Sequence, residues 1–187
     1  MPQGSVLEPT HFHVYINDLD EVTHMIEMLR KFADDTKAGQ RVGTEEGRAK
    51  LQVTLDGLCE WARRWGMQFN IKKCKVMHVG HANTRHVYTM EGQPLESVEE
   101  ETDIGVRVAS TLKPTTQCHK AAQTARTVIG QIARAFHYRD RHVFIKLYNI
   151  FVRPHLEFST VAWAPWTQSD IECLETCRNL PYKWFPA

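Results

Sequence analysis

Cysteine is scarce in this chain, and long apolar runs are absent from it. The cysteines are odd in number and widely spaced: Cys59, Cys74, Cys118, Cys173 and Cys177. This pattern argues against the disulfide framework of a small secreted domain. No apolar run approaches the ~20 residues that span a bilayer, and the N-terminal region lacks the basic start and apolar segment of a secretory signal. We therefore expect an intracellular protein with reduced thiols and no membrane partner.

Net charge is also small, because 23 Lys and Arg oppose 22 Asp and Glu. Its distribution is uneven. Residues 1–35 carry seven acids and two bases, whereas residues 113–153 hold eight Lys or Arg against Asp140 alone. A basic segment of this kind is typical of a surface that binds a polyanion such as nucleic acid. It is equally typical of a solvated helical face, so the charge pattern alone leaves both interpretations open.

Enough apolar material is present for a core, since 42% of the residues are hydrophobic. Residues 25–32 have the composition of a strand and end at Asp34, Asp35 and Thr36. Asp accepts turn geometry because its side chain can bond to its own backbone, so a hairpin with Asp34 and Asp35 at its tip is predicted. His11 and His13 alternate as in a strand, and a surface role is expected for them rather than a ligand role.

Further elements follow from periodicity and capping. Thr44 is a suitable N-cap for an amphipathic helix that stops at Gly66. Strands are predicted over residues 67–71 and 74–79, and a hairpin over residues 88–95. Beyond Pro114 the period becomes helical, with one apolar stripe on the first helix: Ala125, Val128, Ile129, Ile132 and Phe136. Two more helices are predicted over residues 143–151 and 170–179, separated by Pro154 and the loop at residues 163–166. The fold class is therefore α+β, with a boundary near residues 110–114.

Adjacent carboxylates at a turn have two interpretations. Asp34 and Asp35 repel each other, and a divalent cation relieves that repulsion, since hard oxygen ligands suit Mg²⁺. Acidic pairs in hydrated turns are nevertheless common. The pair alone does not decide between a metal site and a wet turn.

Motifs around this pair resemble a known family. MPQGSVLEP at residues 1–9, VYINDL at 14–19 and KFADDTK at 31–37 resemble, in order and spacing, the consecutive core motifs of reverse transcriptases. Within them, the chain resembles non-LTR (LINE-type) retrotransposon enzymes of the jockey and chicken-repeat kind. The resemblance continues through residues 61–80, 103–118 and 147–165. It implies a partial reverse-transcriptase palm of strands and helix over residues 1–110, then an all-helical thumb-like region over residues 111–187.

The resemblance implies roles for residues of the palm. Those implied to contact template and nucleotide are Pro2, Gln3, Gly4, Phe32 and Asn70, with Phe32 in a place more often held by Tyr. Asp34 and Asp35 are the implied catalytic metal ligands, for Mg²⁺ or alternatively Mn²⁺. Lys73 is implied to lie near the triphosphate, where its ammonium can neutralise phosphate charge.

The basic helical region occupies the place of the thumb, which holds the template-primer duplex in this family. Its cations are expected to contact phosphates without reading sequence: Lys120, Arg126, Arg134, Arg139, Arg141 and Lys146. The implied partners are an RNA template, a DNA primer and deoxynucleotides, and the implied location is the nucleus. Trp163 and Trp166 fit either base stacking or a helical core, the core being favoured. Cys173 and Cys177 lack a second pair at zinc spacing and are interpreted as core or free thiols.

The chain also departs from the family pattern. The family's first catalytic aspartate lies on a strand before the Pro-Gln-Gly motif, and Asp18 and Asp20 match a different segment. We therefore expect a fragment truncated at the N-terminus, inactive alone, whose family activity is RNA-directed DNA polymerisation. The alternatives are a non-catalytic remnant that binds RNA or DNA, and a folded relic without function. A hairpin without its neighbouring strand also has an unpaired edge, so self-association or partial disorder of residues 1–40 is expected.

Overall fold

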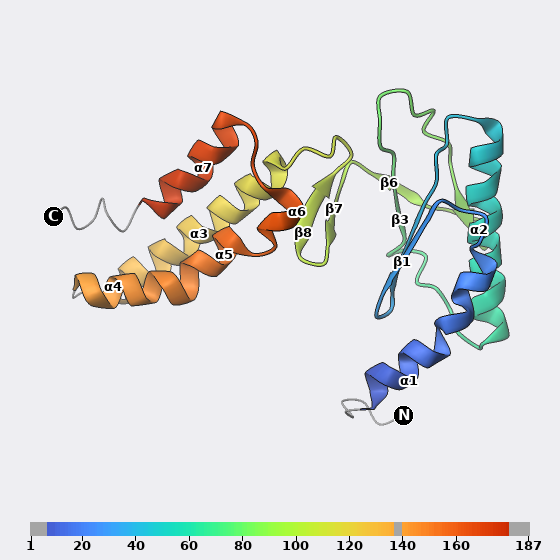
Figure 1. The fold of residues 1–187 in the computed structure, drawn as a ribbon, viewed down its shortest axis with the longest axis horizontal. Helices are drawn as coiled ribbons and strands as arrows, with labels where there is room; N and C mark the ends of the chain where they lie inside the picture. Colours follow the sequence, from blue (N-terminus) through green and yellow to red (C-terminus); the bar gives the residue numbers. More distant parts are fainter. Residues whose placement is uncertain (1–6, 137–139, 180–187) are drawn as a thin grey trace. The chain divides into compact units, whose positions relative to one another are not determined.

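The chain folds into two compact units, unit 1 at Met1–Val98 and unit 2 at Glu99–Ala187. The structure is a computed structural model that describes residues 7–136 and 140–179. Figure 1 traces the elements of both units. The predicted boundary at residues 110–114 falls inside unit 2, because the strand Val106–Ala109 packs against the helix that follows it. Within the described ranges, no helix is both long and apolar enough to cross a membrane.

Unit 1 combines helices with short strands. Its helical elements are α1 (Glu8–Tyr15), the 3-10 helix η1 (Asn17–Val22) and α2 (Glu45–Arg64). Its strands are β1 (Met28–Phe32), β2 (Asp35–Gly39), β3 (Lys75–Met77), β4 (Thr89–Met90), β5 (Gln93–Pro94) and β6 (Glu96–Val98). Antiparallel pairs join β1 to β2 and β4 to β5, and a parallel pair joins β3 to β6. The sheets are therefore small, and helix α2 is the longest element of the unit.

Helix α2 begins and ends at the predicted signals. The Thr44 hydroxyl accepts a hydrogen bond from the Gly47 amide at 3.1 Å, which caps the first turn. Gly66 adopts a φ of 67° just past the last turn, where only glycine is unstrained. The Met67 amide then donates to the Ala62 carbonyl at 2.8 Å, as in a Schellman cap. These local signals fix the ends of the helix that carries the core of unit 1.

The core of unit 1 lies between α2 and the segment that precedes the first hairpin. Its buried residues are Ile16, Leu19, Leu58, Trp61 and Ala62. Leu19 is only 2% exposed, and burying a side chain of this size stabilises the fold by about 1.5–3 kcal/mol. Phe12 and Tyr15 pack partly buried against the same cluster. Burial at positions 12, 15, 16 and 19 follows helical spacing.

That helical spacing corrects one prediction. The alternation of His11 and His13 indicated a strand, but both residues lie in α1, so the strand interpretation is wrong. Both side chains are exposed, so their predicted surface position is confirmed. A helix places Phe12, Tyr15 and Ile16 on one face, where they pack on α2. This packing explains why the segment is helical.

Two of the three remaining strand predictions in unit 1 are confirmed. Strand β3 lies inside residues 74–79, and β4 and β5 form the hairpin of residues 88–95. Its turn residues Glu91 and Gly92 both have positive φ, at 50° and 74°, as in the turns that close tight hairpins. The strand predicted over residues 67–71 is wrong. Met67 and Phe69 instead pack partly buried against the core without pairing in a sheet.

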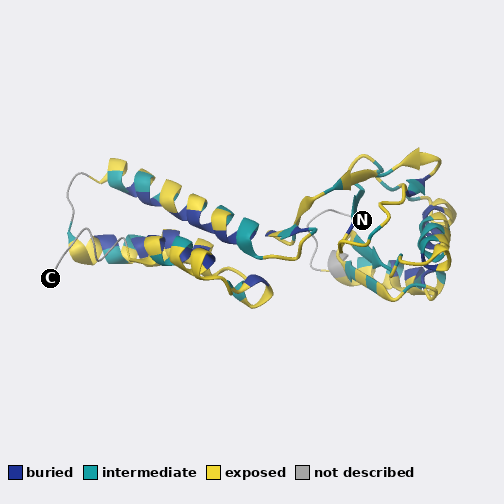
Figure 2. Ribbon diagram, turned by 90° about the horizontal axis from the view of Figure 1, so that it is seen from above, coloured by how far each residue is buried: buried dark blue, intermediate teal, exposed yellow. Residues whose placement is uncertain are grey.

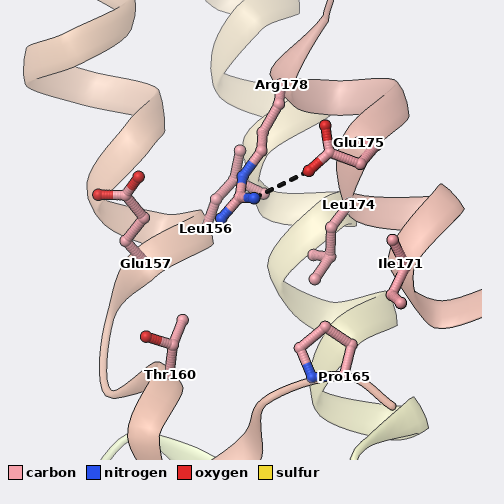
Figure 3. Close-up of a pocket in the computed structure, with 8 residues that line it drawn as sticks. All are labelled: Leu156, Glu157, Thr160, Pro165, Ile171, Leu174, Glu175 and Arg178. Carbon is pink, nitrogen blue, oxygen red and sulfur yellow. Dashed lines mark hydrogen bonds and ion pairs between the residues drawn. The ribbon is translucent and has the colours of Figure 1, made fainter. Parts of the chain in front are cut away.

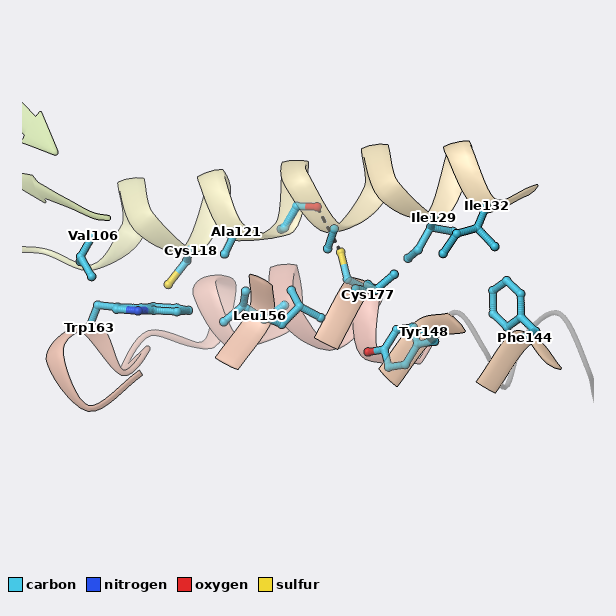
Figure 4. Close-up of a cluster of buried hydrophobic side chains, with 14 residues drawn as sticks. Val106, Cys118, Ala121, Ile129, Ile132, Phe144, Tyr148, Leu156, Trp163 and Cys177 are labelled. Carbon is cyan, nitrogen blue, oxygen red and sulfur yellow. Dashed lines mark hydrogen bonds between the residues drawn. The ribbon is translucent and has the colours of Figure 1, made fainter. Parts of the chain in front are cut away.

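Unit 2 is mainly helical. The hairpin of β7 (Glu100–Asp103) and β8 (Val106–Ala109) precedes α3 (Thr115–Ala135). Within the part of unit 2 that the structure describes, further helical segments follow: α4 (Arg141–Leu147), the π-helix η2 (Tyr148–Val152), α5 (Arg153–Glu157), α6 (Thr160–Trp163) and α7 (Gln168–Arg178). Helix α3 packs against η2, α5 and α7. One continuous core runs along α3, from Val106 at one end to Ile132 and Phe144 at the other (Figure 4).

The apolar stripe of α3 is confirmed with one exception. Ala125, Ile129 and Ile132 are buried, and Val128 packs partly buried against them. In Figure 2 the buried side of this long helix faces the other helices of unit 2, and its exposed side faces away. Phe136 is 44% exposed. Phe136 does not continue the buried stripe, because the helix ends at Ala135 and the backbone of Phe136 is extended.

The helix predicted over residues 143–151 is longer than expected. Helical structure continues without a break from Arg141 through Pro154 to Glu157, so the prediction that Pro154 separates two helices is wrong. Proline cannot donate the amide bond of an α-helix, and the wider turn of η2 directly before it accommodates that loss. The helix predicted over residues 170–179 is confirmed as α7.

Candidate functional site

The adjacent carboxylates lie at the tip of a hairpin, as predicted. Ala33 and Asp34 form the turn, and Asp35 opens β2 opposite Phe32 in the antiparallel register. Ala33 adopts a left-handed φ of 51°, a conformation that costs a residue other than glycine about 1–2 kcal/mol. A positive φ at the first residue of a two-residue turn is typical of tight hairpins. Both carboxylates are exposed.

The two carboxylates have the chemistry of a divalent-metal ligand pair. In the part of the chain that the structure describes, neither Asp34 nor Asp35 accepts a side-chain hydrogen bond or joins an ion pair. Their oxygens therefore remain available to a cation, and Mg²⁺ is typically held by one or two carboxylates with water completing its shell. No group of three or more His, Cys, Asp or Glu side chains gathers among the described residues. The hairpin thus presents two adjacent carboxylates, and no third such group joins them among the described residues.

Phe32 shares the outer face of the hairpin with Asp35. Its side chain is 59% exposed, and the register pairs it directly with Asp35. An exposed aromatic ring beside a carboxylate can stack on a base or a sugar. Its predicted contact with template or nucleotide stays a prediction.

The inner face of the hairpin is tied to the preceding segment by Lys31. Its ammonium donates to the Asp20 carboxylate at 3.0 Å and to the Ile16 carbonyl at 3.2 Å. Only 21% of the Lys31 side chain is exposed. Sequence reasoning missed this residue, although the alternation along β1 already places it on the face opposite Phe32.

Asp18 and Asp20 are engaged within unit 1. The two Asp18 oxygens accept hydrogen bonds from the indole nitrogens of Trp61 and Trp65, at 2.9 and 3.0 Å. Asp20 forms the ion pair with Lys31. Neither carboxylate gathers with Asp34 and Asp35 into a group of three among the described residues. The expectation that they do not replace the first aspartate of the pattern stays a prediction.

Asn70 and Lys73 lie on a turn between α2 and β3. The Lys73 amide donates to the Asn70 carbonyl at 2.9 Å, and both side chains are exposed. They are brought close to each other but belong to an element separate from the hairpin. Pro2, Gln3 and Gly4 lie outside the described residues, so the structure gives no account of their predicted contacts.

Among the described residues of unit 2, the cations predicted to contact nucleic acid lie on α3 and on α4. Lys120 and Arg134 point away from the buried stripe of α3, as their helical positions require. Arg126 lies beside α7, with its guanidinium 4.0 Å from the Cys173 sulfur. Arg141 and Lys146 are exposed on α4, and Arg139 lies outside the described residues. Three cations on one helix can contact phosphates. Arg126 and Arg134 are exposed, whereas Lys120 is half-buried and donates to the Gly105 carbonyl at 3.4 Å.

Comparison with known proteins decides the family. Residues 1–132 match the family described as reverse transcriptase (RNA-dependent DNA polymerase). The chain belongs to the reverse transcriptase family. The matched range includes the hairpin, the Asn70 and Lys73 turn, and most of α3.

Two relatives of this chain are RNA-directed DNA polymerases from mobile elements. The RNA-directed DNA polymerase from mobile element jockey of Drosophila melanogaster is 33% identical over 84 residues, which cover 40% of this chain and 9% of the relative. Its counterpart in Drosophila funebris is 27% identical over 173 residues, covering 85% of this chain and 19% of the relative. The resemblance to jockey-like non-LTR retrotransposon reverse transcriptases is thus confirmed. The chain spans less than a fifth of either relative's length. No solved structure matches it.

A hollow of about 560 Å³ lies on unit 2. Its apolar lining comes from Leu156, Pro165, Ile171 and Leu174. Figure 3 shows Arg178 joined to Glu175, at 2.8 Å, and Glu157 across from them. Glu157 in turn pairs with Arg153 at 2.9 Å. Both carboxylates are thus neutralised by a guanidinium, and this surface offers phosphate less free positive charge than the outer face of α3.

Most of the tryptophan and cysteine side chains considered as candidate site residues in unit 2 belong to its core or pack against it. Trp163 is buried and its indole donates to the Phe158 carbonyl at 2.8 Å, whereas Trp166 is 71% exposed. The core interpretation therefore holds for Trp163 alone. Cys173 and Cys177 are free thiols. Cys177 is fully buried in the core (Figure 4), where its thiol donates to the Ala122 carbonyl at 3.6 Å. Burial raises the pKa of this thiol.

Proposed function

We propose that this chain forms the metal-binding part of the palm, together with a helical thumb-like region, of an RNA-directed DNA polymerase. The observation that carries the proposal is the β1–β2 hairpin, which presents Asp34 and Asp35 exposed inside the region that matches the reverse transcriptase family. The strands and helix of unit 1 and the helices of unit 2 support this α+β arrangement. Family membership supports an RNA template, a DNA primer and deoxynucleotides as partners.

Each site residue has a role in this proposal. Asp34 and Asp35 hold Mg²⁺, or alternatively Mn²⁺, through exposed oxygens that no described residue engages. When bound, such ions stabilise the charge that develops on the phosphoryl oxygens during nucleotidyl transfer. Lys73 neutralises triphosphate charge as a point donor. Phe32, Asn70 and the segment of Pro2, Gln3 and Gly4 contact nucleotide and template.

Catalysis is proposed to need a further carboxylate. Phosphoryl transfer depends almost entirely on positioning and charge stabilisation, and two ions require shared ligands to stay fixed. The described residues offer only Asp34 and Asp35 as a group. A family-like segment that carries an aspartate, joined before Pro2, can supply such a carboxylate for a test. The 187-residue chain alone is therefore expected to extend no primer.

Primer extension tests this proposal directly. The chain is measured alone and joined to a family-like upstream segment that carries the aspartate, on an RNA template with Mg²⁺ or Mn²⁺. Extension by the joined protein that Asp34→Asn abolishes is the expected result. Glu60→Gln is the matched control, because Glu60 is an exposed acid on α2 away from the hairpin tip. Equal extension by the joined protein and its Asp34→Asn variant would refute the metal role.

A second function, nucleic-acid binding without catalysis, is favoured by one observation. The exposed cations of α3 belong to unit 2, a compact unit that does not contain the hairpin. Binding by unit 2 needs only these cations, whereas polymerisation needs the carboxylates as well. The test is affinity for a primer-template duplex in the Asp34→Asn chain. Affinity unchanged from the original chain supports binding as a separable function, and a lost affinity argues against it.

A further inference from the structure

The hairpin that carries Asp34 and Asp35 has little sheet structure to hold it. Within the described ranges, β1 and β2 pair with each other and with no other strand. An isolated two-stranded hairpin is marginally stable in water. Met28 and Phe32 on its outer face are 41% and 59% exposed, so that face contributes little packing. Contacts of the inner face therefore contribute to fixing the direction in which the tip points.

Lys31 makes the inner contact nearest the tip. It stands directly before Phe32, and its ammonium reaches both the Asp20 carboxylate at 3.0 Å and the Ile16 carbonyl at 3.2 Å. At the other end of the hairpin, the Glu27 amide donates to the Gln40 side chain at 3.0 Å. The hairpin is thus held at its base by Gln40 and near its tip by Lys31.

The groups that receive the Lys31 ammonium are themselves fixed to α2. Ile16 is 6% exposed and belongs to the core of unit 1. Asp18, between Ile16 and Asp20 in sequence, accepts the indole hydrogens of Trp61 and Trp65. A lysine side chain bonded to this fixed segment loses conformational freedom. Strand β1, which carries Lys31, is restrained with it.

We propose that Lys31 is a positioning residue, which fixes the hairpin tip and its carboxylate pair relative to α2 through Ile16, Asp20 and the Asp18 clamp on two tryptophans. This inference rests on the proposed metal role of Asp34 and Asp35. Lys31 touches neither the metal nor the nucleotide in this proposal. It acts by holding both carboxylates in one orientation, so that a cation binds without first ordering the tip.

Manganese binding by the 187-residue chain tests the proposal. Paramagnetic broadening of the Asp34 and Asp35 backbone amides by Mn²⁺ is titrated in the original chain and in Lys31→Met, Lys31→Arg and Asp20→Asn. Lys31→Met keeps the length of the side chain but removes its charge, and we expect about a tenfold loss of affinity, as for other supporting groups of metal sites. Lys31→Arg should recover much of that loss. Asp20→Asn should weaken binding less, because the Ile16 carbonyl still accepts from Lys31.

A matched control separates positioning from a general loss of stability. Lys50→Met removes another lysine of unit 1 with one ion pair, to Glu46 at 2.7 Å on the surface of α2, and it should leave Mn²⁺ affinity unchanged. Hydrogen exchange of α2 amides reports whether each variant keeps its fold. If Lys31→Met unfolds unit 1, the milder variant Asp20→Asn tests the proposal instead. Weaker Mn²⁺ binding by Asp20→Asn, with the α2 amides still protected from hydrogen exchange, supports the proposal.

The outcomes distinguish this inference from the function on which it rests. Broadening that Asp34→Asn abolishes establishes the metal role, and equal Mn²⁺ affinity in Lys31→Met then overturns the role of Lys31 alone. Absence of broadening at Asp34 and Asp35 in the original chain overturns the metal role and this inference with it. A tenfold loss in Lys50→Met would also overturn it, since any lost ion pair would then have the same effect.

Discussion

Unit 1 and unit 2 are similar in length, but their buried side chains are organised differently. The core of unit 2 is continuous along α3 and includes residues from every helix that packs on it. The core of unit 1 is smaller and is supplemented by polar clamps, in which Asp18 holds two tryptophans and Lys31 holds the hairpin. Elements with few apolar contacts open most easily. The carboxylate pair is thus placed on an element whose orientation depends on hydrogen bonds.

From this comparison, we expect the largest loss of unfolding free energy for a substitution in the core of unit 2. Leu156 is 1% exposed in the cluster that lines α3, so Leu156→Ala should cost about 2–5 kcal/mol of unfolding free energy through lost burial and a cavity. Hydrogen exchange should accelerate for α3 and α7 amides, with α2 unaffected. Val161→Ala is the control because Val161 is fully exposed. Equal acceleration in both units would show that the chain unfolds as one.

The second prediction concerns the polar clamp of unit 1. Asp18→Ala leaves two indole nitrogens without their acceptor, and one of them belongs to the buried Trp61. The expected cost is about 1–3 kcal/mol, the usual penalty for a buried donor left unpaired. Asp18→Asn should cost less, because its single carbonyl oxygen can still accept one of the two bonds. Urea unfolding followed by tryptophan fluorescence measures both variants, and no loss in either would contradict the clamp.

These interactions also show which features can be predicted from the sequence and which cannot. The α2 helix and the hairpin tip were predicted because their signals are local: Thr44 caps a turn three residues away, and Asp34 sits in its own turn. The strand over residues 67–71 failed because Met67 and Phe69 bury against α2, and composition does not reveal which surface an apolar residue covers. Pairs such as Asp18 with Trp61 or Lys31 with Asp20 join distant positions and leave no local pattern.

The third prediction places nucleic-acid binding on unit 2. Lys120 and Arg134 lie on the face of α3 that points away from the core. If each contacts one phosphate, the double variant Lys120→Gln/Arg134→Gln should lower the salt dependence of duplex binding by about two in log-log slope. Fluorescence anisotropy at several salt concentrations gives that slope.

The matched control for this binding prediction lies on the acidic side of the same unit. Arg178→Gln removes one cation that is already paired with Glu175 at 2.8 Å, so the slope should stay as in the original chain. A slope that falls equally in Arg178→Gln would indicate that total charge, and not the α3 face, governs binding. A slope unchanged in the double variant would exclude the α3 face as the contact surface.

The smallest predicted effect tests whether the thiols of unit 2 are structural. Burial is the main cause that raises the pKa of Cys118 from 9.0 to about 11. Because the folded state holds this proton more tightly than the unfolded state, the contribution to stability is full below about pH 9 and is lost as pH rises toward 11. Cys118→Ala should therefore flatten the decline of unfolding free energy over that range without changing its slope below pH 8. Burial also raises the pKa of Cys177, so part of the decline remains in the single variant. Chemical unfolding at a series of pH values measures the difference, and an unchanged decline in Cys118→Ala would show that another group causes it.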